Sequence, residues 1–529
     1  MPANDSRERT WTPPDDAALK ALAEEYGLAC LDAVPDEALD PALVTDLPVE
    51  WARTNLLLPG RLNGELCAFT ADPRRLEPLS YLSLLAGESL RPVAVPAEAV
   101  AAAIERCYYR RDHSPGAFLQ DLPTEGPIPE RSSERAADLF EVSVTAPVSQ
   151  LANLILLEAL KKGASDIHIE PFDNRLRVRY RVDGVLFEQA SPPKRIEETL
   201  VSRLKVMARL DIAEKRLPQD GMARVRVGDR EVDVRVSTVP VAEGERVVLR
   251  LLDRDSALLP LETLGMAPAM FETFRGLLNE SHGIVIVCGP TGSGKTTTLY
   301  AALSQLDASR KNIMTIEEPI EYQLPDIGQI QVKPKIGLTF ASGLRHILRQ
   351  DPDVILVGET RDMDTAEIAM RASLTGHLVF TTLHANDASG AVVRLVDMGV
   401  DAHLVAACLK AALAQRLVRK LCPACKRDEQ PNPDWLAELG NWTRPLRGRT
   451  LGTATGCPEC LEGYRGRIGL FELMVANADM REAIRTGTAG AEALRAIGAR
   501  TGWRDLLADG ADKILAGTTS LAEVRAVQG

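Results

Sequence analysis

The spacing of hydrophobic positions changes several times along the chain, and each change predicts a different kind of element. In the first part, apolar residues recur at helical spacing over 15–26 and again over 98–109, with short apolar runs such as 56–58 between them. This mixture predicts a small domain of helices and short strands at residues 1–110. No motif in this domain indicates a chemical function.

The regular spacing of apolar residues ends at about residue 110. Residues 111–141 are rich in proline, serine and charged residues, and they hold too few apolar residues to pack a core. We expect this stretch to be a linker between two folded parts of the chain.

A second domain combines a helical pattern with strict alternation. Helical spacing covers 147–163, and apolar residues then alternate with polar ones over 175–182 up to Asp183-Gly184, a typical hairpin turn. One more helical segment and two strand-like segments follow, at 196–210, 231–238 and 246–252. The combination predicts a compact α+β domain at residues 142–254.

One face of the alternating segment carries four arginines: Arg175, Arg177, Arg179 and Arg181. Two interpretations are open. The face is either an ordinary solvated strand surface, which is common on half-exposed antiparallel strands, or a charged surface that contacts a neighbouring subunit or a phosphate group.

From residue 255 onward, apolar runs alternate with helical patterns. The runs are 283–288, 312–316, 354–357 and 378–382. Strands that alternate with helices predict a parallel sheet covered by helices. We therefore assign residues 255–529 to an α/β domain.

Composition and charge exclude several classes of protein. The 529 residues are 45% apolar and 26% charged, values typical of folded globular proteins, and a chain of this length predicts three or four domains. No apolar run is long enough to span a bilayer, and the polar N-terminus does not resemble a secretory signal, so we expect a cytoplasmic protein. Residues 1–50 hold 12 acidic and 3 basic side chains, a net −9 of the total −12, so a general nucleic-acid-binding surface is not expected.

The strongest motif is a complete GxxxxGK[ST] sequence that follows the apolar run 283–288 and precedes a helical segment. Glycines let backbone N–H groups surround phosphates, and the helix N-terminus adds partial positive charge. We expect Lys295 to reach the β- and γ-phosphates and Thr296 to bind Mg²⁺. The predicted nucleotide-binding residues are Gly289, Pro290, Thr291, Gly292, Ser293, Gly294, Lys295, Thr296 and Thr297.

Polar residues with catalytic potential stand at the ends of the later apolar runs. Glu359 follows the run 354–357, and we expect it to orient the attacking water. Three carboxylates that include Glu318 follow the run 312–316, and we expect them at the same sheet edge. His377 and His384 flank the next run and are candidates for contact with the γ-phosphate.

Four of the nine cysteines form two CxxC pairs separated by 31 residues: Cys422, Cys425, Cys457 and Cys460. Two such pairs present four thiolates to one tetrahedral ion, which predicts a closed structural Zn²⁺ site in a subdomain at 415–475. Residues 426–456 hold five basic and four acidic side chains. This balance argues against nucleic-acid recognition and favours a structural role.

These motifs together resemble the assembly ATPases of the type II secretion and type IV pilus superfamily. The segment ASDIHIEP at 164–171, the P-loop, TIEEPIE at 315–321, LRQDPDVILVGETRD at 348–362 and TGHLVFTTLHAND at 375–387 stand in the order known for that family, and the cysteine quartet is followed by GYRGRIGLFE at 463–472. The resemblance implies a RecA-like P-loop core with an inserted zinc subdomain, and ATP, Mg²⁺ and Zn²⁺ as ligands.

The resemblance also implies a biological setting. Members form hexamers at the cytoplasmic face of the bacterial inner membrane and push on a membrane platform protein to assemble a pseudopilus, after a cytoplasmic recruiter docks their N-terminal domain. Arginines of the second domain complete the nucleotide site of a neighbouring subunit in this family, and Arg216, Arg235 and Arg250 are the positions that we would test. The sequence departs from the family at Glu318, where an aspartate is usual.

Three alternatives remain. Within the family we favour the type II secretion branch over type IV pilus extension, which shares nearly every motif. A nucleic-acid motor is disfavoured by the acidic balance. A nucleotide-binding scaffold without turnover is disfavoured because Lys295, Thr296 and Glu359 are all present.

Overall fold

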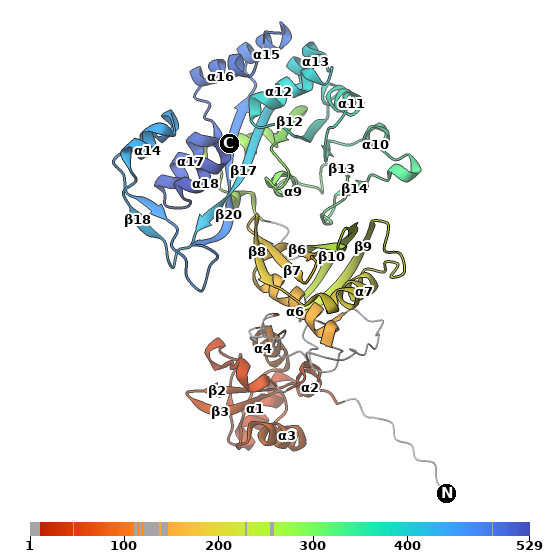
Figure 1. Cartoon of the computed structure of the whole chain (residues 1–529), viewed down its shortest axis with the longest axis vertical. Coiled ribbons are helices and arrows are strands. Elements are labelled where there is room, and N and C mark those ends of the chain that lie inside the picture. Colours follow the sequence, from red (N-terminus) through yellow and green to blue (C-terminus); the bar gives the residue numbers. More distant parts are fainter. Residues whose placement is uncertain are drawn as a thin grey trace. The chain divides into compact units, whose positions relative to one another are not determined.

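The computed structural model describes residues 11–109 except 46, 147–227, 230–253, 259–488 and 490–528, together with residues 115, 119, 137 and 138. The chain separates into two compact units, residues 1–254 and 255–529 (Figure 1). The predicted linker 111–141 lies almost wholly outside the described residues.

The N-terminal domain is a four-stranded sheet in the order β1-β4-β3-β2, with helices around it. The two predicted helices are present as α1 and α4, and the apolar run 56–58 leads into β2. The helices are α1 (Asp16–Glu25), α2 (Val49–Asn55), α3 (Leu76–Ala86) and α4 (Ala97–Tyr109). The strands are β1 (Ala29–Cys30), β2 (Leu57–Leu62), β3 (Glu65–Thr70) and β4 (Arg91–Ala94).

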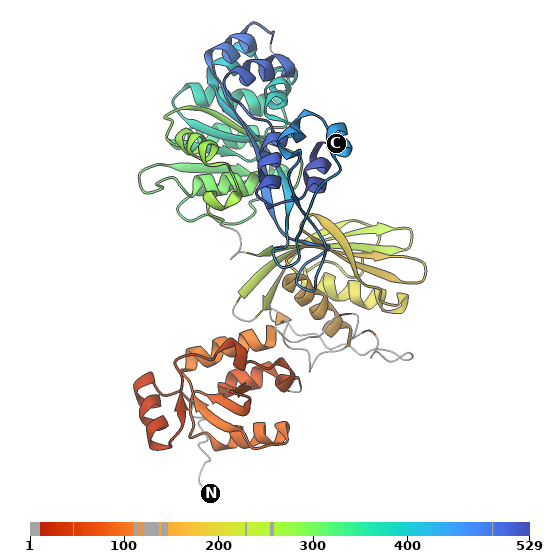
Figure 2. The same cartoon turned by 90° about the vertical axis from the view of Figure 1, so that its left-hand side faces the viewer.

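The second domain is the predicted α+β fold. Its strands follow the order β5-β9-β10-β11-β6-β7-β8, and the two helices lie on one face of the sheet, as Figure 2 shows. Alternate residues of β7 are buried, and Tyr180 on the buried face donates a hydrogen bond to the Ile155 carbonyl. The elements are α6 (Pro147–Lys161), α7 (Glu197–Met207), β5 (Ala137–Asp138), β6 (Ala164–Pro171), β7 (Leu176–Val182), β8 (Val185–Ala190), β9 (Gln219–Val227), β10 (Arg230–Val241) and β11 (Gly244–Asp253).

The core of the second unit is a seven-stranded sheet in the order β14-β13-β15-β16-β12-β17-β20. All neighbouring strands are parallel except the last pair, β17 and β20. The four apolar runs predicted as strands are β12, β13, β15 and β16. The strands are β12 (Gly283–Cys288), β13 (Ile313–Glu317), β14 (Gly328–Gln331), β15 (Val354–Val357), β16 (Leu378–Leu383), β17 (Leu409–Leu421) and β20 (Tyr464–Val475).

Helices cover both faces of this sheet. The strand β12 is buried at every position, in agreement with this arrangement. Ile284 and Ile286 pack into one core with α10 to α13, whereas Val285 and Val287 pack into the other with α8 and α9. Burial on both faces is typical of a parallel sheet in an α/β protein. The helices are α8 (Pro268–Leu277), α9 (Lys295–Leu303), α10 (Phe340–Ile347), α11 (Met363–Leu374), α12 (Ala388–Asp397) and α13 (Ala402–Cys408).

The two CxxC pairs lie in the stretch between β17 and β20, and four helices follow β20 in the described residues. The C-terminal helix α18 packs on β17, because Glu523 accepts hydrogen bonds from the Arg419 backbone at 2.9 Å and from its guanidinium at 2.8 Å. The elements are β18 (Arg427–Glu429), α14 (Pro433–Glu438), β19 (Leu451–Thr453), α15 (Ala478–Arg485), α16 (Ala491–Arg500), α17 (Leu506–Leu515) and α18 (Leu521–Gln528).

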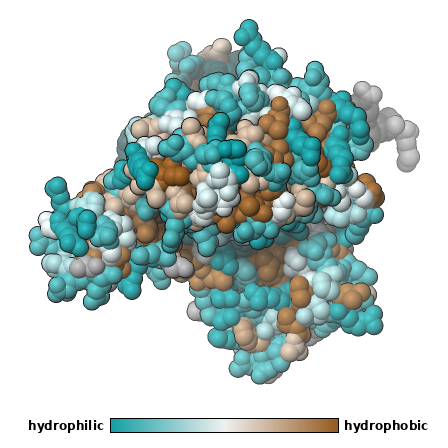
Figure 3. Space-filling model, turned by 90° about the horizontal axis from the view of Figure 1, so that it is seen from above, coloured by the Kyte–Doolittle hydropathy of each residue, from teal (hydrophilic) through white to brown (hydrophobic). Residues whose placement is uncertain are grey.

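On the surface shown in Figure 3, hydrophilic side chains predominate, with hydrophobic ones in small groups between them. None of the helices in the described part of the chain combines the length and the apolar character needed to cross a membrane.

Candidate nucleotide and zinc sites

The P-loop connects the end of β12 to the start of α9, as the motif predicts. Gly292 and Gly294 adopt left-handed φ values of 78° and 87°, which glycine tolerates best. A Cβ at Gly289 would lie 2.5 Å from the Gln415 carbonyl oxygen, so β17 leaves no room for a larger residue there. The glycines are therefore required both by backbone conformation and by close packing.

Lys295 is the first residue of α9, and its side chain lies over the loop. Its ammonium donates to the Gly289 and Pro290 carbonyls, at 2.9 Å each. Burial lowers the pKa of Lys295, while the nearby Glu359 carboxylate opposes this shift. The lysine is thus positioned at the loop that the motif assigns to the phosphates.

The loop fits a phosphate group on structural grounds. No atom lies within 4 Å of the point where a Cβ of Gly292 would stand, and the buried Ser293 hydroxyl has no hydrogen-bond partner among the described residues. An open glycine loop with an unpaired donor at a helix N-terminus suits an anion. Thr296, in the first turn of α9, offers the hydroxyl that would hold Mg²⁺.

The catalytic candidates meet just beyond the carboxyl ends of β13, β15 and β16. The Arg361 guanidinium contacts Glu359 at 2.7 Å (Nη2 to Oε2) and Glu318 at 2.9 Å (Nη1 to Oε2). The Nε2 atom of His384 lies 3.0 Å from the other oxygen of Glu359. Glu318, Glu359 and His384 are therefore brought together, as the sequence predicts, with Arg361 at the centre of the cluster.

The charge state of Glu359 follows from these contacts. Burial alone would raise its pKa, but the hydrogen bond from Arg361 and the charges of Arg361, His384 and Lys295 lower the pKa below the usual range of a glutamate. Glu359 is therefore a carboxylate at neutral pH, the form that can orient a water molecule.

Glu317, the first of the three clustered carboxylates, ends β13 at the expected sheet edge. Its side chain is buried and accepts hydrogen bonds from Tyr300, from Thr315 at 2.5 Å and from Gln329 at 3.1 Å. These partners make it part of the packed interior, and a role at the nucleotide stays a prediction.

The expectation about His377 is wrong. His377 precedes β16, whereas His384 follows that strand, so the two histidines lie at opposite ends of β16. His377 contacts the Pro352 carbonyl through Nδ1 at 2.6 Å, and its own carbonyl accepts from Gly283 at the start of β12. Since the P-loop follows the end of β12, His377 is a structural residue at the far edge and not a γ-phosphate contact.

Sequence reasoning missed two residues of the site. Arg361 belongs to the segment that carries Glu359, and a cation two residues after a candidate catalytic carboxylate was an available signal. Gln415 accepts a hydrogen bond from Thr298 at 2.7 Å and lies against Gly289 and Gly294. No local pattern marks Gln415, because only the pairing of β17 with β12 brings it behind the P-loop.

The three candidate trans-acting arginines lie in the first unit. Arg235 on β10 and Arg250 on β11 are direct cross-strand partners. Arg250 contacts Asp166 at 2.9 Å, and Arg235 contacts Asp220 only at 3.9 Å. Arg216 is exposed and held by Glu214 at 2.9 Å. Their contact with a nucleotide stays a prediction.

The arginine face of β7 is partly neutralised by its neighbour β6. Glu170 accepts from Arg177 at 3.0 Å and from Arg179 at 2.6 Å, and Arg246 of β11 approaches it to 2.8 Å. The hydrogen bonds from Arg179 and Arg177 outweigh burial and lower the pKa of Glu170. These arginines are therefore paired within the domain and are not simply solvated.

The four cysteines converge as the spacing predicts. Their sulfur atoms all lie within 4.8 Å of one another, and the distances for Cys422–Cys457, Cys425–Cys460 and Cys457–Cys460 are 3.9, 3.7 and 3.6 Å. Zn–S bonds of about 2.3 Å in a tetrahedron place sulfurs about 3.8 Å apart. Four thiols at this spacing fit a structural zinc ion. The antiparallel pairing of β17 with β20 brings the two CxxC pairs to one end of the hairpin.

Comparison with known proteins agrees with this architecture. The family model described as Type II/IV secretion system protein matches residues 141–526, and the MshEN domain model matches residues 26–114. A solved structure of the Legionella pneumophila ATPase DotB covers 75% of this chain and 97% of its own length, with a TM-score of 0.53 at 20% identity. This likeness shows the fold alone.

Sequence relatives extend over nearly the whole chain. The Type II secretion system protein E of Pectobacterium carotovorum is 47% identical over 90% of this chain and 96% of its own length, and the protein of that name from Pseudomonas aeruginosa is 46% identical over 93% and 98%. The type IV pilus assembly ATPase PilB of Myxococcus xanthus is 40% identical over 95% and 89%. The chain belongs to the Type II/IV secretion system protein family.

Proposed function

We propose that this chain is an ATPase that converts ATP and water to ADP and phosphate and thereby drives type II protein secretion. The observation that carries the proposal is the position of Glu359, a carboxylate held by both Arg361 and His384 at the sheet edge where the P-loop begins. Similarity to two proteins named Type II secretion system protein E over nine tenths of the chain supports the secretion role.

In the proposed reaction the P-loop binds the phosphates through its backbone N–H groups. Lys295 leaves the Gly289 and Pro290 carbonyls and contacts the β- and γ-phosphates. Thr296 would hold Mg²⁺, which neutralises phosphate charge when it is bound. Each of these groups stabilises negative charge, which is the main contribution that a protein makes to phosphoryl transfer.

Glu359 then orients the attacking water and accepts its proton. Arg361 and His384 fix the two oxygens of this carboxylate, and a fixed base reduces the entropic cost of reaching the reactive geometry. Glu318 contacts the other terminal nitrogen of Arg361. We infer that Glu318 helps to place the water, although its side chain is one methylene longer than the aspartate that is usual in the family.

We further propose that the protein works as a homohexamer at the cytoplasmic face of the bacterial inner membrane. In this arrangement Arg216, Arg235 or Arg250 of one subunit would approach the nucleotide of the next, so hydrolysis would depend on assembly. Residues 1–110 would dock a cytoplasmic recruiter, and a membrane platform protein would receive the mechanical work. No role in nucleic-acid binding is proposed.

A second candidate is type IV pilus assembly, since the PilB protein of Myxococcus xanthus is 40% identical over 95% of this chain. Deletion of the gene in its host separates the two. The first proposal predicts that protein secretion stops while surface pili persist. Loss of pili with normal secretion would favour the second candidate.

A further inference from the structure

The segment that carries His384 is held from several sides. It joins β16 to α12, and its first carbonyl, on Leu383, accepts from the Gly289 N–H at 3.3 Å. Arg416 of β17 donates to the Asn386 carbonyl at 3.0 Å, and the Cys288 thiol donates to the Asp387 carbonyl at 3.3 Å. The segment is thus attached to the end of β12, to the first residue of the P-loop and to β17.

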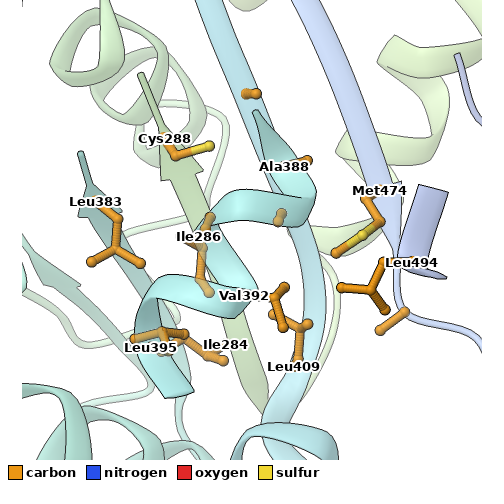
Figure 4. Close-up of a cluster of buried hydrophobic side chains, with 14 of the residues drawn as sticks. Ile284, Ile286, Cys288, Leu383, Ala388, Val392, Leu395, Leu409, Met474 and Leu494 are labelled. Atoms are coloured by element: carbon orange, nitrogen blue, oxygen red, sulfur yellow. The ribbon is translucent and has the colours of Figure 1, made fainter. Parts of the chain in front are cut away.

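The end of this segment reaches a buried carboxyl group that belongs to none of these strands. Ala388, the first residue of α12, donates its backbone N–H to Glu472 at 3.3 Å. Glu472 lies in β20 and is 2% exposed. Figure 4 shows Ala388 at the start of α12 beside the end of β12, with β20 on the other side of the helix.

Glu472 also lies near the start of a second helix. The backbone N–H of Leu506, the first residue of α17, acts to lower the pKa of its carboxyl group. Helix N-termini leave backbone donors unsatisfied and carry partial positive charge, so both helix ends favour an acceptor at this position. One buried carboxyl group therefore holds the segment that carries His384 and lies near the N-terminus of α17.

The groups around Glu472 are mostly acidic. Asp387 and Asp505 cap the two helices, and Arg495 of α16 pairs with Asp387 at 2.7 Å. Burial, reinforced by Asp387 and Asp505, raises the pKa of Glu472 to about 7, while the Ala388 and Leu506 N–H groups oppose this. Cys288 and Arg416 complete the charged and titratable surroundings. Burial of a carboxyl group beside other acidic groups costs free energy. Its presence here indicates a specific role for its hydrogen bonds.

We propose that Glu472 is a positioning residue for ATP hydrolysis. It holds the N-terminus of α12 and thereby keeps His384 in contact with Glu359. The inference rests on the proposed function, because it assumes that the contact between His384 and Glu359 serves hydrolysis. Only three residues separate His384 from Ala388, so displacement of the helix end shifts the histidine. Misplacement of a catalytic group by about 1 Å can lower a rate 10²-fold.

A neighbouring carboxylate provides a matched control. Asp509 of α17 is also buried, and it accepts from the Phe471 N–H at 2.9 Å, one residue before Glu472. Its other partner is Lys513 of the same helix. Asp509 supports the packing of α17 on β20, but within the described part of the chain no hydrogen bond or ion pair joins it to the segment that carries His384.

The test compares full-length Glu472→Met, Glu472→Gln and Asp509→Asn in ATP hydrolysis and in hydrogen exchange of residues 384–391. Methionine keeps the volume of the side chain but cannot accept the Ala388 N–H, whereas glutamine can. We expect Glu472→Met to lower kcat about 10-fold. KM for ATP should change less than about 2-fold because the P-loop is intact. Hydrogen exchange of the backbone amides at 384–391 should be faster than in the wild type. Glu472→Gln should restore most of kcat, and Asp509→Asn should leave kcat and this exchange near wild type.

Wild-type kcat and exchange in Glu472→Met would overturn the proposal, and so would equal losses in Asp509→Asn, which would indicate general packing. If Glu472→Met does not fold, Arg495→Ala tests the same segment from the surface, and the proposal predicts faster exchange at 384–391 there. Lys295→Ala in the same assay separates the two levels of inference. Undiminished hydrolysis by that variant rejects the proposed ATPase site, whereas the exchange result for Glu472 is independent of turnover.

Discussion

Arg361 donates to Glu359 across 2.7 Å and makes the carboxylate of the proposed water-orienting residue part of a fixed ion pair. The same guanidinium reaches Glu318 at 2.9 Å. The pair sets both the charge and the orientation of Glu359, and it therefore decides what substitutions at this edge should do.

Glu359→Gln should bind ATP with little change in affinity and hydrolyse it slowly. Glutamine retains the size of the side chain but cannot accept a proton, and loss of a general base costs on the order of 10²-fold in kcat. Phosphate release measured beside binding of a fluorescent ATP analogue checks this. Loss of binding instead of turnover would assign Glu359 to Mg²⁺ or to structure.

Arg361→Ala should reduce kcat about 10-fold, since charge-assisted hydrogen bonds contribute roughly 1.5–3 kcal/mol and this one is partly exposed to solvent. The substitution should also raise the pKa of Glu359, so activity should fall at a higher pH on the acidic side than in the wild type. Arg371→Ala is a matched control, because Arg371 pairs with Glu367 on the surface of α11. Equal effects of the two substitutions would argue against a role for Arg361 in the site.

Metal analysis of the purified chain should find one zinc ion per chain, and Cys422→Ser should lose it. The substitution should lower the thermal unfolding midpoint, because the free energy of zinc binding, which stabilises the folded state, would be lost. Cys408→Ser serves as the control, since Cys408 lies in the core apart from the quartet. A well-folded wild type that contains no metal would refute the zinc site.

Stability of the second domain should depend on pH through Glu170. Its pKa is lowered in the folded state by Arg179 and Arg177, so its contribution is present above the unfolded value of about 4.3 and is lost as pH falls through the lower folded value. Glu170→Gln should therefore destabilise the protein at pH 7, and its difference from the wild type should shrink as the pH falls below about 4.3. Glu188→Gln, at an exposed pair with Arg175 at 3.8 Å, should have little effect at any pH in this range. A constant difference between wild type and Glu170→Gln at all pH values would contradict the ion-pair interpretation.

Parts of the site that depend on short spacing could be predicted from the sequence. The P-loop and the two CxxC pairs are local, and the apolar runs that became β12, β13, β15 and β16 are continuous enough to be recognised. Contacts with residues that are distant in the sequence could not be predicted. Glu317 is buried because Tyr300 and Gln329 reach it, and Gln415 meets the P-loop only through strand pairing.

His377 shows the same limit in another form. In the sequence His377 is equivalent to His384, because both flank one strand. That strand has six residues, however, and a rise of about 3.3 Å per residue separates its two ends by roughly 20 Å. Direction along the strand, and not proximity in sequence, decides which histidine meets Glu359.

The central claim, that this P-loop hydrolyses ATP, is tested most directly by the rate of phosphate release from Mg·ATP by full-length Lys295→Ala beside the wild type. Lys295 lies over the loop carbonyls and supplies its cation to the phosphates, so the account predicts a loss of about 10²-fold or more. Zinc content and the unfolding midpoint should stay at wild-type values. Hydrolysis by Lys295→Ala at the wild-type rate would contradict the account.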